Sequence, residues 1–111
     1  MIKRISLVAR KPGMTREAFL EHWMGPHVEI VRTLPGLRGL QLNIIAEGGE
    51  GGWDGIGELW FDSIDAARQA FAAEPVAGML AADRPQFLGL NEVYFVAEHA
   101  VIPPPRERDR S

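Results

Sequence analysis

The sequence predicts an α+β fold with the element order β-α-β-β-α-β, and three features support this prediction. Four segments alternate apolar and polar residues with a period of two, as strands do; they lie at residues 2–10, 38–46, 56–61 and 90–98. Helical patterns follow the first and third of these segments, and a glycine-rich hairpin connection at residues 47–55 joins the second to the third. A four-stranded antiparallel sheet with two helices on one face, the ferredoxin-like arrangement, satisfies this order.

The helix after the first strand carries the most informative pattern. Thr15 stands at the N-cap position, where its hydroxyl can accept a hydrogen bond from a free amide of the first turn. Phe19, Trp23 and His27 follow at spacings of four, so they share roughly one face. Pro26 removes an amide donor and is expected to interrupt the helix just before His27. The pattern therefore predicts an imidazole at a kink, beside aromatic side chains.

The second half of the chain repeats this organisation. Ser63 is the expected N-cap of the second helix, which Pro75 interrupts before a short further piece at residues 76–82. The chain then ends in a segment rich in proline and charge, which cannot bury enough surface to order itself. We expect one domain over residues 1–101 and a flexible tail over residues 102–111.

Composition narrows the classes of function. The 111 residues include 46% hydrophobic residues and carry a net charge of −3, which argues against a nucleic-acid-binding surface. The chain has no cysteine, so disulfides, thiolate metal sites and cysteine nucleophiles are excluded. No apolar run approaches the length of a membrane span. We expect a cytoplasmic protein with neither a nucleic-acid nor a membrane partner.

The histidines give no sign of a metal centre. The three of them are scattered and lack the spacing of metal ligands, so we expect no metal and no cofactor. His22 lies about 100° from Trp23 around an α-helix, which predicts that its side chain is exposed.

The sheet also predicts a partner. The first strand places Ile5, Leu7 and Ala9 on one parity and Arg4, Ser6 and Val8 on the other, so one of its faces is strongly apolar. Apolar residues occur on both parities of the first, third and fourth strands, while the helices cover only one face of the sheet. A second copy of the chain would cover the other face, and we predict a homodimer.

Several motifs, taken in this order, resemble the EthD-type domain family. They are RKPGMTREAF at residues 10–19, Trp23-x-x-x-His27, Leu34-Pro-Gly-Leu-Arg38, Gly57-Glu-Leu-Trp-Phe-Asp-Ser63 before an alanine-rich helix, and Asp83 followed by Phe87. The resemblance covers the chain to about residue 101. It implies a dimeric α/β barrel and a relation to methylmuconolactone isomerases and to dehydratase-like or decarboxylase-like enzymes on polyketide-type substrates. Other members, named for ether-degradation gene clusters, have no settled activity.

The residue types favour proton transfer. His27 lies on an apolar helix face, and the ordinary pKa of a histidine is near neutrality. Burial would lower this pKa and keep His27 a neutral base. Glu58 lies mid-strand and is predicted to orient this base or to transfer a proton itself, and Asp83 could close the mouth of the pocket. The predicted substrate-binding walls are aromatic; they comprise Phe19, Trp23, Trp60 and Phe87.

Each assignment has a structural alternative. His27 could be a core histidine bonded to backbone, Glu58 a solvated or dimer-interface carboxylate, and Asp83 a turn residue. Two classes of function therefore remain. One is a cofactor-independent isomerase or lyase acting on a small unsaturated, lactone-like or aromatic-polyketide-like substrate, with a cofactor-free monooxygenase as a variant. The other is a non-catalytic small-molecule-binding accessory protein of a degradation pathway.

Overall fold

A computed structural model describes residues 1–48 and 50–105 of the chain. The strands are β1 (Ile2–Arg10), β2 (Gly39–Ile44), β3 (Gly55–Phe61) and β4 (Leu88–Val96). The helices are α1 (Arg16–His22), a π-helical turn (Trp23–His27), α2 (Val28–Val31), α3 (Ile64–Ala72), α4 (Val76–Asp83) and a 3-10 turn (Arg84–Gln86). The predicted element order is confirmed, and each strand boundary lies within two residues of its expected place. Of the expected tail, residues 106–111 lie outside the described residues.

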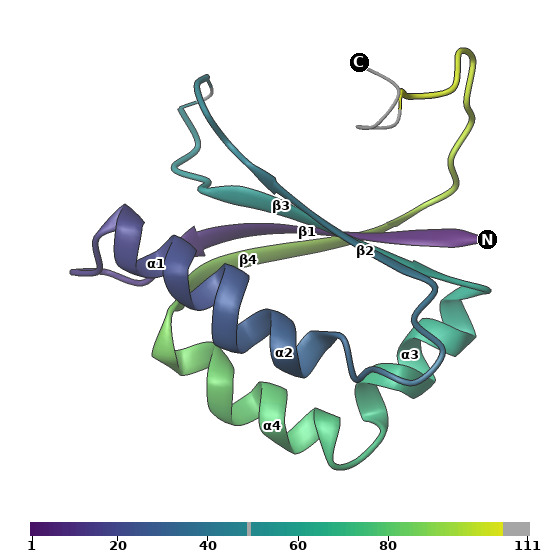
Figure 1. Cartoon of the computed structure of the whole chain (residues 1–111), viewed down its shortest axis with the longest axis horizontal. Helices are drawn as coiled ribbons and strands as arrows, with labels where there is room; N and C mark the ends of the chain where they lie inside the picture. Colours follow the sequence, from purple (N-terminus) through teal and green to yellow (C-terminus); the bar gives the residue numbers. More distant parts are fainter. Residues whose placement is uncertain (49, 106–111) are drawn as a thin grey trace.

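The four strands form one antiparallel sheet in the order β2-β3-β1-β4. All the helices lie on one side of this sheet, and the opposite side is open (Figure 1). This is the ferredoxin-like arrangement that the sequence predicts. Among the described residues, no helix is long and apolar enough to cross a membrane.

The two faces of β1 are used differently from what its composition suggests. Arg4, Ser6 and Val8 face the helices and line a cavity beneath them. Ile5 and Leu7, the more apolar set, alternate with these residues and therefore face the open side of the sheet. The strongly apolar face of β1 thus lies away from the helical layer, and a half-polar face looks into the core.

Two apolar clusters fill the space between the sheet and the helices. The larger cluster joins α2, α3 and α4 to β3 and contains Val31, Leu34, Leu59, Phe61, Ala67, Ala70, Val76 and Leu80. The smaller cluster contains Val8, Phe19, Trp23 and Phe87. Helix caps hold the ends of these helices in place: Thr15 accepts a hydrogen bond from the Ala18 amide, and Ser63 accepts one from the Ala66 amide, as the sequence predicts.

The first helix differs from its prediction at Pro26. The chain does not break there; it passes through a π-helical turn and continues directly into α2. A π-turn widens the helix by one residue per turn, so the amide that proline lacks is not required at that point. Trp23 begins this turn, and its ring lies so close to Gly55 of β3 that a Cβ atom on Gly55 would approach it to 2.4 Å.

Candidate functional site

Two histidines of the first helical segment share one carboxylate. Asp83 is the last residue of α4 and is 9% exposed. Its Oδ1 lies 2.7 Å from Nε2 of His22, and its Oδ2 lies 2.8 Å from Nδ1 of His27. The side chains of His22 and His27 are 24% and 16% exposed. The three residues form a nearly buried imidazole–carboxylate–imidazole cluster, here called the His22–Asp83–His27 cluster.

The π-turn explains how two histidines five residues apart reach the same carboxylate. In an α-helix, five residues correspond to a rotation of about 140° beyond one full turn, so His22 and His27 would face different directions. A π-helix closes its hydrogen bonds between residues five apart, which brings the two imidazoles to the same side. His22 was expected to be exposed, and that prediction was wrong because its imidazole contacts Asp83 and stacks on Phe87, two residues far away in the sequence.

The cluster determines where the protons lie. Burial alone would raise the pKa of Asp83, but the hydrogen bonds from His22 and His27 outweigh it, and the net pKa lies below its ordinary value. Asp83 is therefore an ionised acceptor, so Nδ1 of His27 must donate the hydrogen bond. Burial lowers the pKa of His27, and its contact with Asp83 offsets only part of this shift. At neutral pH, His27 is an uncharged imidazole with its lone pair on Nε2.

The Phe87 ring packs against both imidazoles. Its ring is 1% exposed and lies 4.7 Å from the His22 ring, in a stacked geometry, and 4.9 Å from the His27 ring. Phe19 packs behind Phe87 at 5.5 Å between ring centroids. Aromatic contacts at these distances fix the positions of both rings. The cluster is therefore held by packing as well as by hydrogen bonds.

His27 opens onto a cavity between the sheet and the helices, and His22 does not line it. The cavity measures about 50 Å³. Its polar lining comprises Arg4, Ser6, His27, Arg84 and Asn91. The remainder of the lining is apolar and includes Trp23, Val28, Leu42, Phe71, Leu80 and Phe87. Among the described residues, none donates or accepts a hydrogen bond at Nε2 of His27, which leaves this atom available for a ligand.

The structure does not bring all the predicted site residues together. Trp23 and Phe87 line the cavity, and Phe19 lies behind them in the core. Asp83 was expected to close the mouth of the pocket, and that expectation was wrong. Asp83 is the last residue of α4, its Oδ2 contacts Nδ1 of His27, and it is not among the residues that line the cavity.

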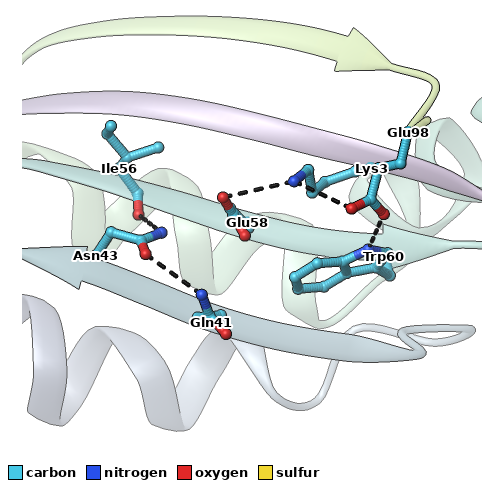
Figure 2. Close-up of polar contacts among 7 residues, drawn as sticks. All are labelled: Lys3, Gln41, Asn43, Ile56, Glu58, Trp60 and Glu98. Atoms are coloured by element: carbon cyan, nitrogen blue, oxygen red, sulfur yellow. Dashed lines mark hydrogen bonds and ion pairs between the residues drawn. The ribbon is translucent and has the colours of Figure 1, made fainter. Parts of the chain in front are cut away.

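Glu58 and Trp60 lie on the open side of the sheet, away from the helices (Figure 2). There Lys3 contacts both Glu58, at 3.5 Å, and Glu98, at 3.3 Å, and the Trp60 indole donates a hydrogen bond to Glu98. Glu58 and Trp60 alternate with Leu59, which is 5% exposed and belongs to the core beneath the helices. Within one chain, therefore, Glu58 and Trp60 do not share a pocket with His27, contrary to the prediction.

Sequence reasoning missed three polar residues near His27: His22, Arg4 and Arg84. The five-residue spacing of His22 and His27 across a Gly-Pro pair was a signal for a π-turn that could have been used. Arg4 and Arg84 gave no comparable signal, because a single arginine in a strand or after a helix is ordinarily a surface residue. Among residues 1–48 and 50–105, no group of three or more His, Cys, Asp or Glu side chains has the geometry of a metal site.

The fold and the cavity define a ferredoxin-like α+β protein with an imidazole at a small internal pocket. The EthD domain model matches residues 11–91, so the chain belongs to the EthD domain family, and the resemblance carried by the motifs is confirmed. A comparison with curated protein sequences found no match.

Solved structures support the same placement. An EthD family protein from Bacillus halodurans is 26% identical, with a TM-score of 0.75 over 89% of this chain and 99% of that one. A dimeric ferredoxin-like protein of unknown function from Thermobifida fusca is 18% identical, with a TM-score of 0.68 over 87% and 90% of the two chains. The hydroxynitrile lyase of Passiflora edulis is 12% identical, with a TM-score of 0.71 over 92% and 96%. The last two likenesses concern the fold alone.

Proposed function

We propose that the protein is a cofactor-independent isomerase or lyase that acts by proton transfer on a small unsaturated substrate, with His27 as the group that moves the proton. The contact between Nδ1 of His27 and Asp83 carries this proposal. It fixes the tautomer that directs an unprotonated Nε2 away from Asp83, on a ring that lines the cavity. The hydroxynitrile lyase of similar fold shows only that this architecture can host a lyase.

The proposed reaction begins at a carbon next to a carbonyl group. Nε2 of His27 takes a proton from this carbon, the C–H bond breaks, and its electron pair moves onto the carbonyl oxygen as an enolate. The imidazolium that forms is stabilised by the ionised Asp83. Return of the proton to a different carbon gives an isomer, whereas transfer to a leaving oxygen as its C–O bond breaks gives an elimination product and water. Both outcomes regenerate neutral His27.

His22 acts on this site through Asp83 as a positioning residue. It occupies Oδ1, so Asp83 cannot rotate away from His27 without losing a second hydrogen bond. Because His22 contacts Asp83 but does not line the cavity, it is not in reach of a bound substrate. His22 therefore keeps the carboxylate fixed on Nδ1 of His27.

The cavity volume of about 50 Å³ favours a small substrate. Engineered apolar cavities that accept benzene are about 150 Å³, roughly three times larger, so the cavity holds only part of such a molecule and the remainder lies at its solvent-facing side. The cavity includes Asn91 of edge strand β4, which is exposed, so this side gives access from solvent. A substrate enters beside Asn91 and meets the imidazole of His27 from the interior side.

The proposed functional unit is a homodimer. Ile5, Leu7 and Ile56 face the open side of the sheet, and Tyr94, on the same side, is 53% exposed. Dimeric proteins among the structures of similar fold support a second copy as the partner on this side. Replacement of Tyr94 by lysine is expected to give a monomer in light-scattering measurements, whereas Val93→Lys on the other side of the same strand leaves the dimer intact. Dimers in both variants would contradict this arrangement.

The test of the reaction uses carbon acids that change visibly on proton transfer. β,γ-Unsaturated lactones such as α-angelica lactone become conjugated when a proton moves from the α to the γ carbon, and proton NMR in D₂O follows both exchange and product. We expect His27→Gln to abolish the catalysed rate, while His99→Gln, which replaces an exposed histidine, retains it. Equal rates in wild type and His27→Gln across a panel of such lactones would contradict the proposed role of His27.

A further inference from the structure

Two arginines face the same cavity as His27. Arg4 comes from β1 and Arg84 from the turn directly after Asp83, and both line the cavity. No aspartate or glutamate of the described residues lines it. The interior of the pocket is therefore positively charged, although the chain as a whole carries a net charge of −3.

Neither guanidinium has a carboxylate partner within the part of the chain that the structure describes. Arg4 lies with its guanidinium carbon 4.1 Å from the centre of the Phe71 ring. A guanidinium at this distance is held by a cation–π contact, which does not use up the hydrogen-bonding capacity of its N–H groups. No fully buried side-chain nitrogen in the described residues lacks a hydrogen-bond partner, so any Arg4 nitrogen without a partner is not fully buried, and Arg4 is among the residues that line the cavity.

The two charges also act on each other and on the imidazole. Burial, with a further contribution from the positive charge of Arg84, lowers the pKa of Arg4 to about 10. The same charge on Arg84 lowers the pKa of His27. The charge of Arg84 thus acts on both Arg4 and His27. A positive charge that is partly removed from water and has no counter-ion is unfavourable, and an anion in the cavity would relieve this cost.

We propose that Arg4 and Arg84 bind the carboxylate of the substrate, so that the substrate of this pocket is a small unsaturated carboxylate. A planar carboxylate matches the two parallel N–H groups of a guanidinium better than a neutral carbonyl does. Asn91 adds a further donor, since its Oδ1 already accepts a hydrogen bond from Ser6 and its amide NH₂ has no partner within residues 1–48 and 50–105. The inference rests on the proposed function and names the class of its substrate.

This arrangement also orients the reacting carbons. With the carboxylate held by Arg4 and Arg84, the unsaturated part of the molecule extends along the apolar lining toward His27. Arg84 and Asp83 are neighbours in the chain, so the group that holds the substrate and the group that orients the base both lie where α4 passes into the following turn. The two positive charges also stabilise negative charge that develops when His27 removes a proton.

A purely structural role for Arg4 makes the opposite prediction. If its guanidinium only covers Phe71, the cavity has no preference between an anion and a neutral molecule of the same shape. Crotonate and crotonamide form such a pair, because they differ only at the carboxylate. Inorganic phosphate serves as a non-planar anion for comparison.

Binding is measured by NMR titration of the ¹⁵N-labelled protein, which reports both affinity and location without requiring turnover. We expect crotonate to bind at least about tenfold more tightly than crotonamide, from the strength of hydrogen bonds to charged groups. The shifts should centre on amides around the cavity, including those of Gly57 and Leu88. Arg4→Gln and Arg84→Gln should each remove most of this preference. Arg68→Gln is the matched control, since Arg68 is an exposed arginine near the Phe95 ring, outside the cavity, and this variant should bind as wild type does.

Three results would overturn the inference: no binding of crotonate, equal binding of crotonate and crotonamide, or tighter binding of phosphate than of crotonate. A preference that survives in both arginine variants, with their spectra showing a folded protein, would also overturn it. These outcomes are separate from the test of His27. Loss of lactone turnover in His27→Gln combined with equal binding of crotonate and crotonamide would retain the proposed reaction and reject the carboxylate site.

Discussion

Replacement of Asp83 by asparagine tests the His22–Asp83–His27 cluster without changing the size of the side chain. The carboxylate accepts two hydrogen bonds at 2.7 and 2.8 Å. An amide can accept from one imidazole only, and its NH₂ group then faces the other, which must change its tautomer. Hydrogen bonds to charged groups contribute about 1.5–3 kcal/mol, against about 0.5–1.5 kcal/mol for neutral ones. Asp83→Asn should therefore lower the free energy of unfolding by about 2–3 kcal/mol at pH 7.

Urea denaturation measures this loss, and Asp62→Asn supplies the control. Asp62 is paired with Arg38 at 3.0 Å, but its side chain is 65% exposed, so its replacement should cost only about 0–1 kcal/mol. The difference between the two losses in free energy of unfolding measures what burial and the second hydrogen bond contribute at Asp83. Equal losses in Asp83→Asn and Asp62→Asn would refute the reasoning that the two imidazoles and the carboxylate form a buried, charged cluster.

Further predictions concern pH, packing and the cavity. The pKa of His27 is lower in the folded than in the unfolded protein, so the unfolded state binds more protons near pH 6; the free energy of unfolding should fall as the pH drops below about 6.5, and this dependence should weaken in His27→Gln. Gly55→Ala forces a Cβ atom to within 2.4 Å of the Trp23 ring and should destabilise the fold by about 1–3 kcal/mol in urea titrations. Gly57→Ala places its Cβ no closer than 3.8 Å to any neighbour, and unchanged or increased stability together with weaker crotonate binding is expected, since the methyl group fills part of the cavity. Unchanged crotonate binding in Gly57→Ala would mean that the ligand lies elsewhere. Thr15→Ala removes a helix cap and should cost about 1 kcal/mol.

The order of elements was predictable because it depends on local signals. Thr15 and Ser63 cap the helices that follow them, and the alternation in residues 2–10 gives a strand with the same bounds as β1. These features require only the spacing of side chains along a few residues. Contacts between residues far apart in the sequence determine only how the helices pack on one face of the sheet.

The choice of the covered face could not be predicted from β1. Ile5 and Leu7 gave this strand an apolar parity, and apolar residues ordinarily mark the core side. The structure places them on the open side, because Leu59 and Phe61 of β3 decide which face the helices cover. The same fact separates Glu58 and Trp60 from His27. Their shared parity was visible in the sequence, but its direction relative to the helices was not.

The site itself was half predictable. His27 and Phe87 were identified from their spacing and from the motifs of the EthD family, and the cavity lies beside both. Asp83 was selected for a different reason from the one that the structure gives. His22 was missed since its contacts are with residues far away in the sequence, and Arg4 since a charged residue in a strand gives no sign that it faces the interior.

The tautomer of His27 is the most direct test of the proposed chemistry, and it needs no substrate. Long-range ¹H–¹⁵N spectra of the imidazoles at pH 7.5, assigned with His22→Gln and His27→Gln, report which ring nitrogen carries the proton. We expect the proton of His27 on Nδ1, facing Asp83, and a lone pair on Nε2. The ¹⁵N resonance of Nε2 should shift when crotonate is added. A proton on Nε2 of His27 would contradict the proposed base, because no lone pair would then face the cavity.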